Sequence, residues 1–212
     1  MAPFYIPDHH RKTDLGALHG LMRAYPFATV ITDANGDLAV SHIPLHLDDT
    51  VGSHGVLRGH VARANPHWRD LADGKPSLVI FNGPQAYVTP QWYPSKAEHA
   101  RVVPTWNYAV VHAHGTLRAL TDKDWLLANV TELTEAHEAA FAHRWSVSDA
   151  PEDYIDKMLK AIVGLEFTIT RLEGKWKLSQ HRAEPDRLGT INGLAARAQE
   201  TSAAVAELMH AQ

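Results

Sequence analysis

A basic residue stands directly before a helix-start signal in the segment 59–68. Arg63 closes a stretch with β-strand character, and Asn65 and Pro66 are the residue types preferred as the N-cap and the first residue of a helix. A guanidinium group beside free backbone N–H groups can bind a phosphate group. The same pattern fits an ordinary helix cap with a surface ion pair, so the segment alone leaves both interpretations open.

Aromatic and polar side chains alternate in the segment 103–108. Thr105, Trp106 and Asn107 combine a stacking surface with directed hydrogen-bonding groups, which suits a flat heteroaromatic ligand. Aromatic core packing at the start of a strand explains the same alternation. Taken by itself, the segment favours core packing.

Two other strand segments carry polar faces. In 40–46, the two-residue period of a strand places His42 on the face opposite Ser41. Such a His-bearing face can line a ligand cleft, form a partner interface or meet solvent. In 175–182, Lys175, Lys177 and Ser179 share one face, and this small basic stripe suits either a phosphate or a solvated edge strand.

The histidine and cysteine content limits the metal and catalytic chemistry. The chain has 15 His and no Cys, which excludes thiolate catalysis and Cys-ligated zinc or iron–sulfur clusters. His112 and His114 share a strand face without a third ligand in the pattern, and His137 and His143 lie six residues apart where a zinc-protease helix requires four. We therefore predict no metal site, and no residue qualifies as a catalytic acid, base or nucleophile.

The predicted elements are mostly short strands joined by tight turns. Strands at 27–33 and 38–47 flank Asn35-Gly36, which is a strong hairpin signal, and Thr121 is expected to cap a helix. The order of elements predicts an α+β protein with an antiparallel, Greek-key β-barrel and peripheral helices, not a doubly wound sheet. The other expected elements are strands at 56–63, 77–82, 86–89 and 107–120, a hairpin over 165–180 turning at Glu173-Gly174, and helices at 15–25, 65–72, 121–143, 151–162 and 186–210.

Size and composition are those of a globular protein. The 212 residues, 45% of them hydrophobic and 21% charged, predict a barrel domain at 1–180 with a helical insertion at 121–163. A helical tail at 181–212 is expected to pack on the barrel or on a dimer partner. The formal charge of -4 argues against a large nucleic-acid surface. No signal-peptide-like or membrane-spanning run is evident, which predicts a cytoplasmic protein without a membrane partner.

An ordered series of segments resembles the PaiB family of FMN-binding negative transcriptional regulators. The pieces are unspecific one by one, but as an ordered set that spans nearly the whole chain they are specific. In chain order they are Phe4-Tyr5-Ile6-Pro7, Ser41-His42-Ile43-Pro44-Leu45, the segment 59–68, Gly83-Pro84-Gln85-Ala86-Tyr87-Val88, Pro90-Gln91-Trp92-Tyr93, the segment 103–108 and Lys177-Leu178-Ser179-Gln180.

The resemblance implies an FMN-binding split β-barrel related to the pyridoxamine-phosphate oxidase and flavin reductase group, with FMN at a homodimer interface. It assigns His60, Arg63 and Asn65 to the phosphate or the ribityl chain of FMN. Lys177 is assigned either to the cofactor or to barrel closure and the dimer contact. The residues assigned to the neighbourhood of the flavin ring are Ser41, His42, Thr105, Trp106 and Asn107.

The family resemblance implies a negative transcriptional regulator with DNA as a partner. No helix-turn-helix is evident in the sequence, so contact with DNA rests on the resemblance alone. A flavin-dependent oxidoreductase or reductase that uses the bound FMN is the first alternative. A haem-binding or haem-degrading split barrel is the second alternative, because of the number of histidines.

Overall fold

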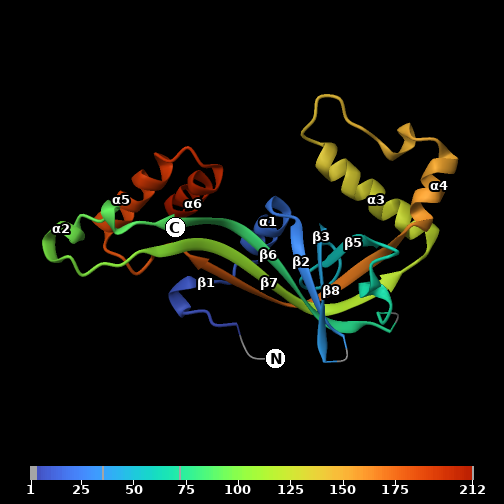
Figure 1. Cartoon of the computed structure of the whole chain (residues 1–212), viewed down its shortest axis with the longest axis horizontal. Helices are drawn as coiled ribbons and strands as arrows, with labels where there is room; N and C mark the ends of the chain where they lie inside the picture. Colours follow the sequence, from blue (N-terminus) through green and yellow to red (C-terminus); the bar gives the residue numbers. More distant parts are fainter. Residues whose placement is uncertain (1–3, 35, 72, 212) are drawn as a thin grey trace. The chain divides into compact units, whose positions relative to one another are not determined.

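A computed structural model describes residues 4–34, 36–71 and 73–211 and confirms the α+β class (Figure 1). Within these residues, eight strands form a sheet in the order β3-β2-β6-β7-β8-β5-β4, and β1 pairs with β8. The strands are β1 (Arg11–Lys12), β2 (Phe27–Ala34), β3 (Asp37–Pro44), β4 (His46–Asp48), β5 (Val56–Ala62), β6 (Lys75–Val88), β7 (Thr105–Leu120) and β8 (Ile162–Lys177). The helices are α1 (Leu15–Ala24), α2 (Ser95–His99), α3 (Lys123–Glu138), α4 (Glu152–Lys160), α5 (Glu184–Ala195), α6 (Glu200–His210) and the 3-10 turns η1 (Asp8–His10), η2 (Pro66–Trp68), η3 (Pro90–Trp92) and η4 (Val147–Asp149).

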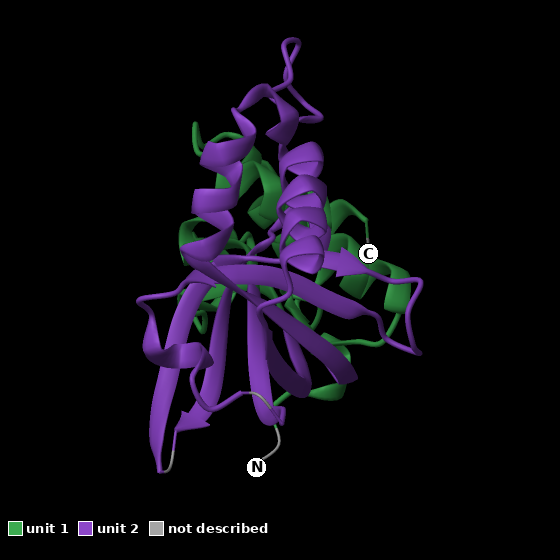
Figure 2. Ribbon diagram, turned by 90° about the vertical axis from the view of Figure 1, so that its right-hand side faces the viewer, with its two compact units in different colours: residues 1–21, 82–111, 173–212 green, residues 22–81, 112–172 purple. Residues whose placement is uncertain are grey.

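The chain divides into two compact units, which Figure 2 shows in different colours. Unit 1 contains residues 1–21, 82–111 and 173–212, and unit 2 contains residues 22–81 and 112–172. Strands β6, β7 and β8 each run from one unit into the other. The units do not coincide with a barrel at 1–180 and a tail at 181–212, and that division into domains stays a prediction.

The β2–β3 hairpin of unit 2 follows the alternation that the sequence predicts. Thr29 pairs with His42 and Val30 pairs with Ser41, with the inward-facing residues buried and His42 exposed. Gly36 has φ +93°, a left-handed conformation that hairpin turns require. Asn35, the other predicted turn residue, lies outside the described residues. The hairpin prediction is confirmed for both strands.

Helices α3 and α4 lie side by side in unit 2 (Figures 1 and 2), joined by an ion pair between Lys123 and Asp156. The prediction that Thr121 caps α3 is wrong, because the side chain of Asp122 accepts the hydrogen bond from the backbone N–H of Trp125. The indole of Trp125 packs on Gly164, where a Cβ atom would lie 2.1 Å from the ring. A glycine is therefore required at this point of β8.

A buried carboxylate ties the strands of unit 2 together. Glu166 of β8 accepts hydrogen bonds from Arg58 of β5 and from Arg118 of β7, at 3.3 Å and 2.9 Å from the Nε atoms. Arg58 also pairs with Asp48 of β4 at 3.2 Å. Such shared, hydrogen-bonded pairs hold a fixed register between neighbouring strands.

Two glycines of unit 1 that are expected to make turns lie inside continuous strands. Strand β6 runs straight through Gly83, and β8 runs straight through Gly174, so the two shorter strands around Gly83-Pro84 and the hairpin at Glu173-Gly174 are wrong. A Cβ atom at Gly83 would lie 2.8 Å from the side chain of Leu21, and one at Gly174 would lie 2.3 Å from Leu18. Both glycines admit a close neighbour instead of making a turn.

The C-terminal helices α5 and α6 confirm the helical character predicted for 186–210. They pack on each other within unit 1, and α5 also contacts η3. The ring of Trp92 lies where a Cβ atom of Gly193 would be, 2.3 Å away, and its carbonyl lies 2.0 Å from the corresponding position at Gly189. Two glycines one helical turn apart thus leave the surface of α5 without side chains where Trp92 packs on it.

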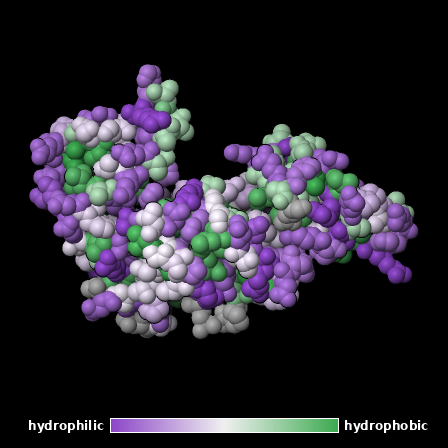
Figure 3. Space-filling model, turned by 180° about the vertical axis from the view of Figure 1, so that it is seen from behind, coloured by the Kyte–Doolittle hydropathy of each residue, from purple (hydrophilic) through white to green (hydrophobic). Residues whose placement is uncertain are grey.

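Hydrophilic and hydrophobic residues are interspersed over the molecular face shown in Figure 3. None of the helices in the described part of the chain combines the length and the apolar character that crossing a membrane requires.

Candidate functional site

A chain of buried hydrogen bonds runs through unit 2 beside the predicted Arg63–Asn65 segment. The hydroxyl of Ser77 donates to the carbonyl of Lys75, so it can only accept from Thr32, 2.7 Å away. The hydroxyl of Thr32 is then committed as a donor, and it must accept from Nε2 of His67 at 3.0 Å. Burial lowers the pKa of His67, which agrees with a neutral ring that carries its proton on Nε2.

The same chain includes two residues predicted to bind the cofactor. Since Nδ1 of His67 has no proton, the hydroxyl of Ser41 donates to it at 2.9 Å. The side-chain amide of Asn65 donates to Ser41 at 3.0 Å, and its oxygen accepts the backbone N–H of His67. Ser41 and Asn65 are thus brought together, and Asn65 is the N-cap that the sequence predicts.

The helix predicted after Asn65 is much shorter than expected. It is a single 3-10 turn, Pro66–Trp68, and the predicted end at Ala72 lies outside the described residues. One turn has few aligned peptide dipoles, and its first free N–H is already capped. Binding of a phosphate in this region therefore has to depend on cationic side chains.

Arg63 supplies such a cation at the end of β5. Its Nε donates to the carbonyl of Lys160 at 2.7 Å and its Nη2 donates to that of Ile162 at 3.0 Å, which leaves three of the five guanidinium N–H groups for other partners. A cavity of about 300 Å³ opens beside it in unit 2. The residues that line the cavity are Arg63, Thr121, Lys123, Leu126, Asp156, Leu159 and Lys160.

The donor set of this cavity fits the phosphate of FMN. Three cationic side chains face one carboxylate, that of Asp156, which is paired with Lys123 at 2.7 Å. Arg63 and Lys160 therefore contribute positive charge that Asp156 does not neutralise. Arginine and lysine are the usual side chains for binding phosphate in proteins.

Two predicted histidines of unit 2 lie apart from this hydrogen-bond chain. His60 of β5 is half-buried, with its Nδ1 3.5 Å from the amide nitrogen of Asn129 in α3, and burial lowers its pKa. The side-chain oxygen of Asn129 is buried without a hydrogen-bond partner. His42 is exposed on β3, where its Nδ1 lies 3.0 Å from the hydroxyl of Thr29. His60 thus lies beside the side chain of Asn129, and His42 faces outward.

The other four predicted residues belong to unit 1, where three of them come together. The ammonium group of Lys177 donates to the hydroxyl of Thr105 and, at 2.8 Å, to the carbonyl of Trp106. Burial, and secondly the charge of Lys175, lowers the pKa of Lys177. The indole of Trp106 is 53% exposed and makes an edge contact with the exposed ring of Tyr87 at 6.1 Å.

Asn107 is turned into the core of unit 1. It is fully buried, its amide oxygen accepts from Ser179 at 3.0 Å, and its amide nitrogen lies 3.3 Å from the sulfur of Met209. Both ends of the amide are therefore used inside the unit.

Sequence patterns missed three residues that contribute to these arrangements. His67 lies in the segment 59–68, but only the fold shows that it links Ser41 to Thr32. Lys123 and Lys160 lie on helices that the sequence predicts to form an insertion, and only the fold places them beside Arg63. Lysines on exposed helices are so common that no local signal distinguishes these two.

The chain matches the family FMN_bind_2, described as "Putative FMN-binding domain", over residues 4–171. It is 36% identical over 224 residues to the uncharacterized protein AN0679 of Emericella nidulans, covering 89% of each chain. It is 31% identical over 205 residues to the protease synthase and sporulation protein PAI 2 of Bacillus subtilis, covering 97% of this chain and 96% of the relative.

Solved structures share the fold at lower sequence identity. The FAD and Heme binding protein from Mycobacterium smegmatis aligns with a TM-score of 0.56 and 20% identity, covering 79% of this chain and 73% of that one. The flavocytochrome Anf3 from Azotobacter vinelandii aligns with a TM-score of 0.56 and 12% identity, covering 81% and 72%. The split-barrel fold class is thereby confirmed. By its match over residues 4–171 and its likeness to PAI 2 along nearly its whole length, the chain belongs to the PaiB-type family of FMN-binding split-barrel proteins, with FMN as its cofactor.

Proposed function

We propose that the protein is a homodimeric FMN-binding negative transcriptional regulator in which Arg63 and Lys160 hold the phosphate of FMN. The observation that carries the cofactor part is the cavity of about 300 Å³ with three cationic side chains and one carboxylate. A phosphate that enters this cavity meets uncompensated positive charge and guanidinium N–H groups. The bound FMN would supply one- and two-electron redox chemistry.

The flavin ring is assigned to the cluster of Lys177, Thr105 and Trp106. An exposed indole offers a flat surface for stacking, and the ammonium group beside it is a hydrogen-bond donor for the polar edge of the ring. In a homodimer with FMN at the interface, the residues assigned to the phosphate and those assigned to the ring come from different chains.

An apolar face on the β2–β3 hairpin supports the homodimer. Phe27, Leu38 and Val40 are 66%, 65% and 50% exposed, and all three stand on the side of the hairpin that bears His42. Strand β3 is at one end of the strand order. A second copy of the chain is a natural cover for such a face, because closed two-fold dimers use the same patch on both subunits.

A comparison of FMN with riboflavin tests the phosphate assignment, because riboflavin lacks only the phosphate. We expect wild-type protein to bind FMN more tightly than riboflavin. Replacing Arg63 by alanine should raise the Kd for FMN about 10- to 100-fold, the equivalent of one charge-assisted hydrogen bond, and leave the Kd for riboflavin nearly unchanged. Quenching of flavin fluorescence during titration measures both constants.

Arg69→Ala is the matched control, because Arg69 is exposed and does not line the Arg63 cavity. It should keep the full preference for FMN. Lys160→Ala should lower the preference in the same direction as Arg63→Ala. Equal Kd values of wild-type protein for FMN and riboflavin, or an unchanged ratio in Arg63→Ala, would show that the phosphate lies elsewhere.

The regulatory part is supported by the ordered family motifs and by the likeness to PAI 2 along 97% of the chain. Its test is selection from a randomised pool of 30-base-pair duplexes at about 50 mM salt. We expect one sequence to be enriched and its affinity to fall steeply as salt is raised, since each neutralised phosphate releases counterions. If no duplex is retained at this low salt, the protein is an FMN-binding protein without a DNA partner, and the regulatory part is wrong.

A further inference from the structure

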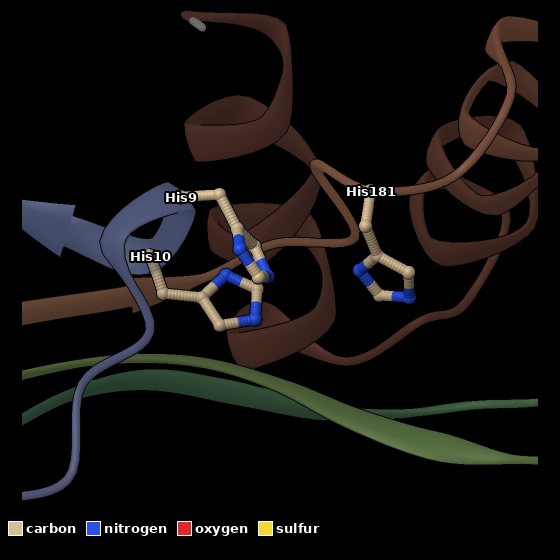
Figure 4. Close-up of side chains that lie close together, drawn as sticks. All are labelled: His9, His10 and His181. Atoms are coloured by element: carbon tan, nitrogen blue, oxygen red, sulfur yellow. The ribbon is translucent and has the colours of Figure 1, made fainter.

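Three histidines of unit 1 form a cluster that includes none of the residues assigned to FMN, although the charge of Lys177 contributes, after burial, to lowering the pKa of His10 and of His181. His9 and His10 are adjacent in η1, and His181 follows β8, outside the residues that match the family. Figure 4 shows the three imidazole rings turned toward one another. A ring nitrogen of each lies within 4.8 Å of those of the other two. The turn η1 and the segment after β8 bring these side chains together across about 170 residues of sequence.

The ring of His10 is held in one tautomer by Gln180. The amide nitrogen of Gln180 donates to the carbonyl of Trp176, and its oxygen accepts the backbone N–H of Leu178 at 2.8 Å. The orientation of the amide is therefore set, and its oxygen faces Nδ1 of His10 at 2.9 Å. An oxygen can only accept, so Nδ1 carries the proton and Nε2 of His10 keeps a free electron pair.

This arrangement is typical of a metal-binding histidine. A ligating imidazole donates its other ring N–H to a fixed oxygen, which sets the ring orientation and increases the basicity of the ligating nitrogen. His10 is 5% exposed and is anchored by Gln180. His9 and His181 are exposed, so their rings can rotate without disturbing the core.

Chemistry and geometry together point to a divalent transition metal. We propose that His9, His10 and His181 bind an ion of the Zn²⁺ class, with a water molecule as the fourth ligand. Zn–N bonds of about 2.0–2.1 Å in a tetrahedron place the nitrogens about 3.3 Å apart. The present spacing of up to 4.8 Å thus has to shorten by about 1.5 Å. Rotation of the two exposed rings toward His10 can close this gap.

Simple ring packing is the competing explanation, since the rings of His9 and His10 lie 4.1 Å apart and each is about 6 Å from that of His181. Calorimetric titration with ZnCl₂ separates the two, using full-length protein with its flavin, purified without a polyhistidine tag and treated with EDTA. We expect one Zn²⁺ per chain. His181→Ala and His9→Ala should each weaken binding about 100-fold or more, since loss of an outer-sphere partner alone costs 10- to 100-fold.

His143→Ala is the matched control, because it also removes an exposed imidazole but lies outside the cluster. It should bind Zn²⁺ as wild type does. The thermal midpoint should rise with Zn²⁺ in wild type and in His143→Ala only, while in EDTA all variants should unfold at nearly the same temperature. Absence of binding to wild type, or equal weakening by His143→Ala and His181→Ala, would overturn the metal site.

Discussion

Replacing Val40 by arginine should give a folded monomer that has lost its flavin. Val40 is half-exposed on the apolar face of the β2–β3 hairpin, so an arginine there is tolerated by the single chain. In a two-fold dimer the substitution buries two unpaired guanidinium groups. Each costs several kcal/mol, so the dimer dissociation constant should rise at least about 1,000-fold. Light scattering on a size-exclusion column gives the mass, and the visible spectrum of the same peak gives the flavin content.

Val51→Arg serves as the control for this experiment. It makes the same change at another exposed valine, in the turn between β4 and β5 and away from the hairpin face. It should elute as a yellow dimer. A dimeric, flavin-bearing Val40→Arg protein would show that the hairpin face is not the dimer interface. A folded monomer that still retains FMN would show that one chain suffices for the cofactor.

Gly115→Ala should lower the free energy of unfolding by about 3 kcal/mol, the upper end of the range for overpacked interiors. Gly115 lies in β7 of unit 2, and a Cβ atom there would be 2.0 Å from the carbonyl oxygen of Thr168 and 2.9 Å from the ring of Phe167. The obstacle includes backbone atoms of β8, which is hydrogen-bonded to β5, so rotation of a side chain cannot relieve it. Urea denaturation followed by circular dichroism measures the change.

Gly20→Ala is the same substitution with the opposite expectation. Gly20 is exposed in α1 and a Cβ atom there would meet nothing within 4 Å, so alanine should stabilise the protein by about 0.5–1 kcal/mol through its helix propensity. A Gly115→Ala protein as stable as wild type would show that β7 and β8 can separate at this point without cost.

The hairpin and the C-terminal helices could be predicted because their signals are local. The two-residue alternation around Ser41 and His42 determines which side of β3 is buried, wherever the partner strand comes from. The turns predicted at Gly83 and Gly174 are wrong because the local sequence is not sufficient there. A glycine that makes a turn and a glycine that admits Leu21 or Leu18 look alike in sequence, because the neighbour lies far away in the chain.

The residues of the candidate site also differ in whether the local sequence could identify them. Arg63 and Asn65 could be singled out by their position at a strand end and a helix cap, and the structure finds them there. Lys160 is 97 residues away from Arg63 and became relevant only when the fold placed it on the same cavity. The cluster of His9, His10 and His181 could not be predicted either, because His181 joins the other two only through packing.

The hydrogen-bond chain through His67 restricts what Ser41 and Asn65 can still offer to a ligand. Ser41 has already given its only proton to His67 and has accepted one bond from Asn65, so it retains a single lone pair. Asn65 retains one amide proton and one lone pair. In the proposed complex Ser41 can therefore meet only a proton-bearing group, such as a ribityl hydroxyl or the imide N–H of the isoalloxazine, and would repel a phosphate oxygen. Asn65 is the member of the pair that can donate a hydrogen bond to an anion. In the proposed complex, the donor and acceptor groups that Ser41 and Asn65 have not already used therefore determine the orientation of the cofactor at this end.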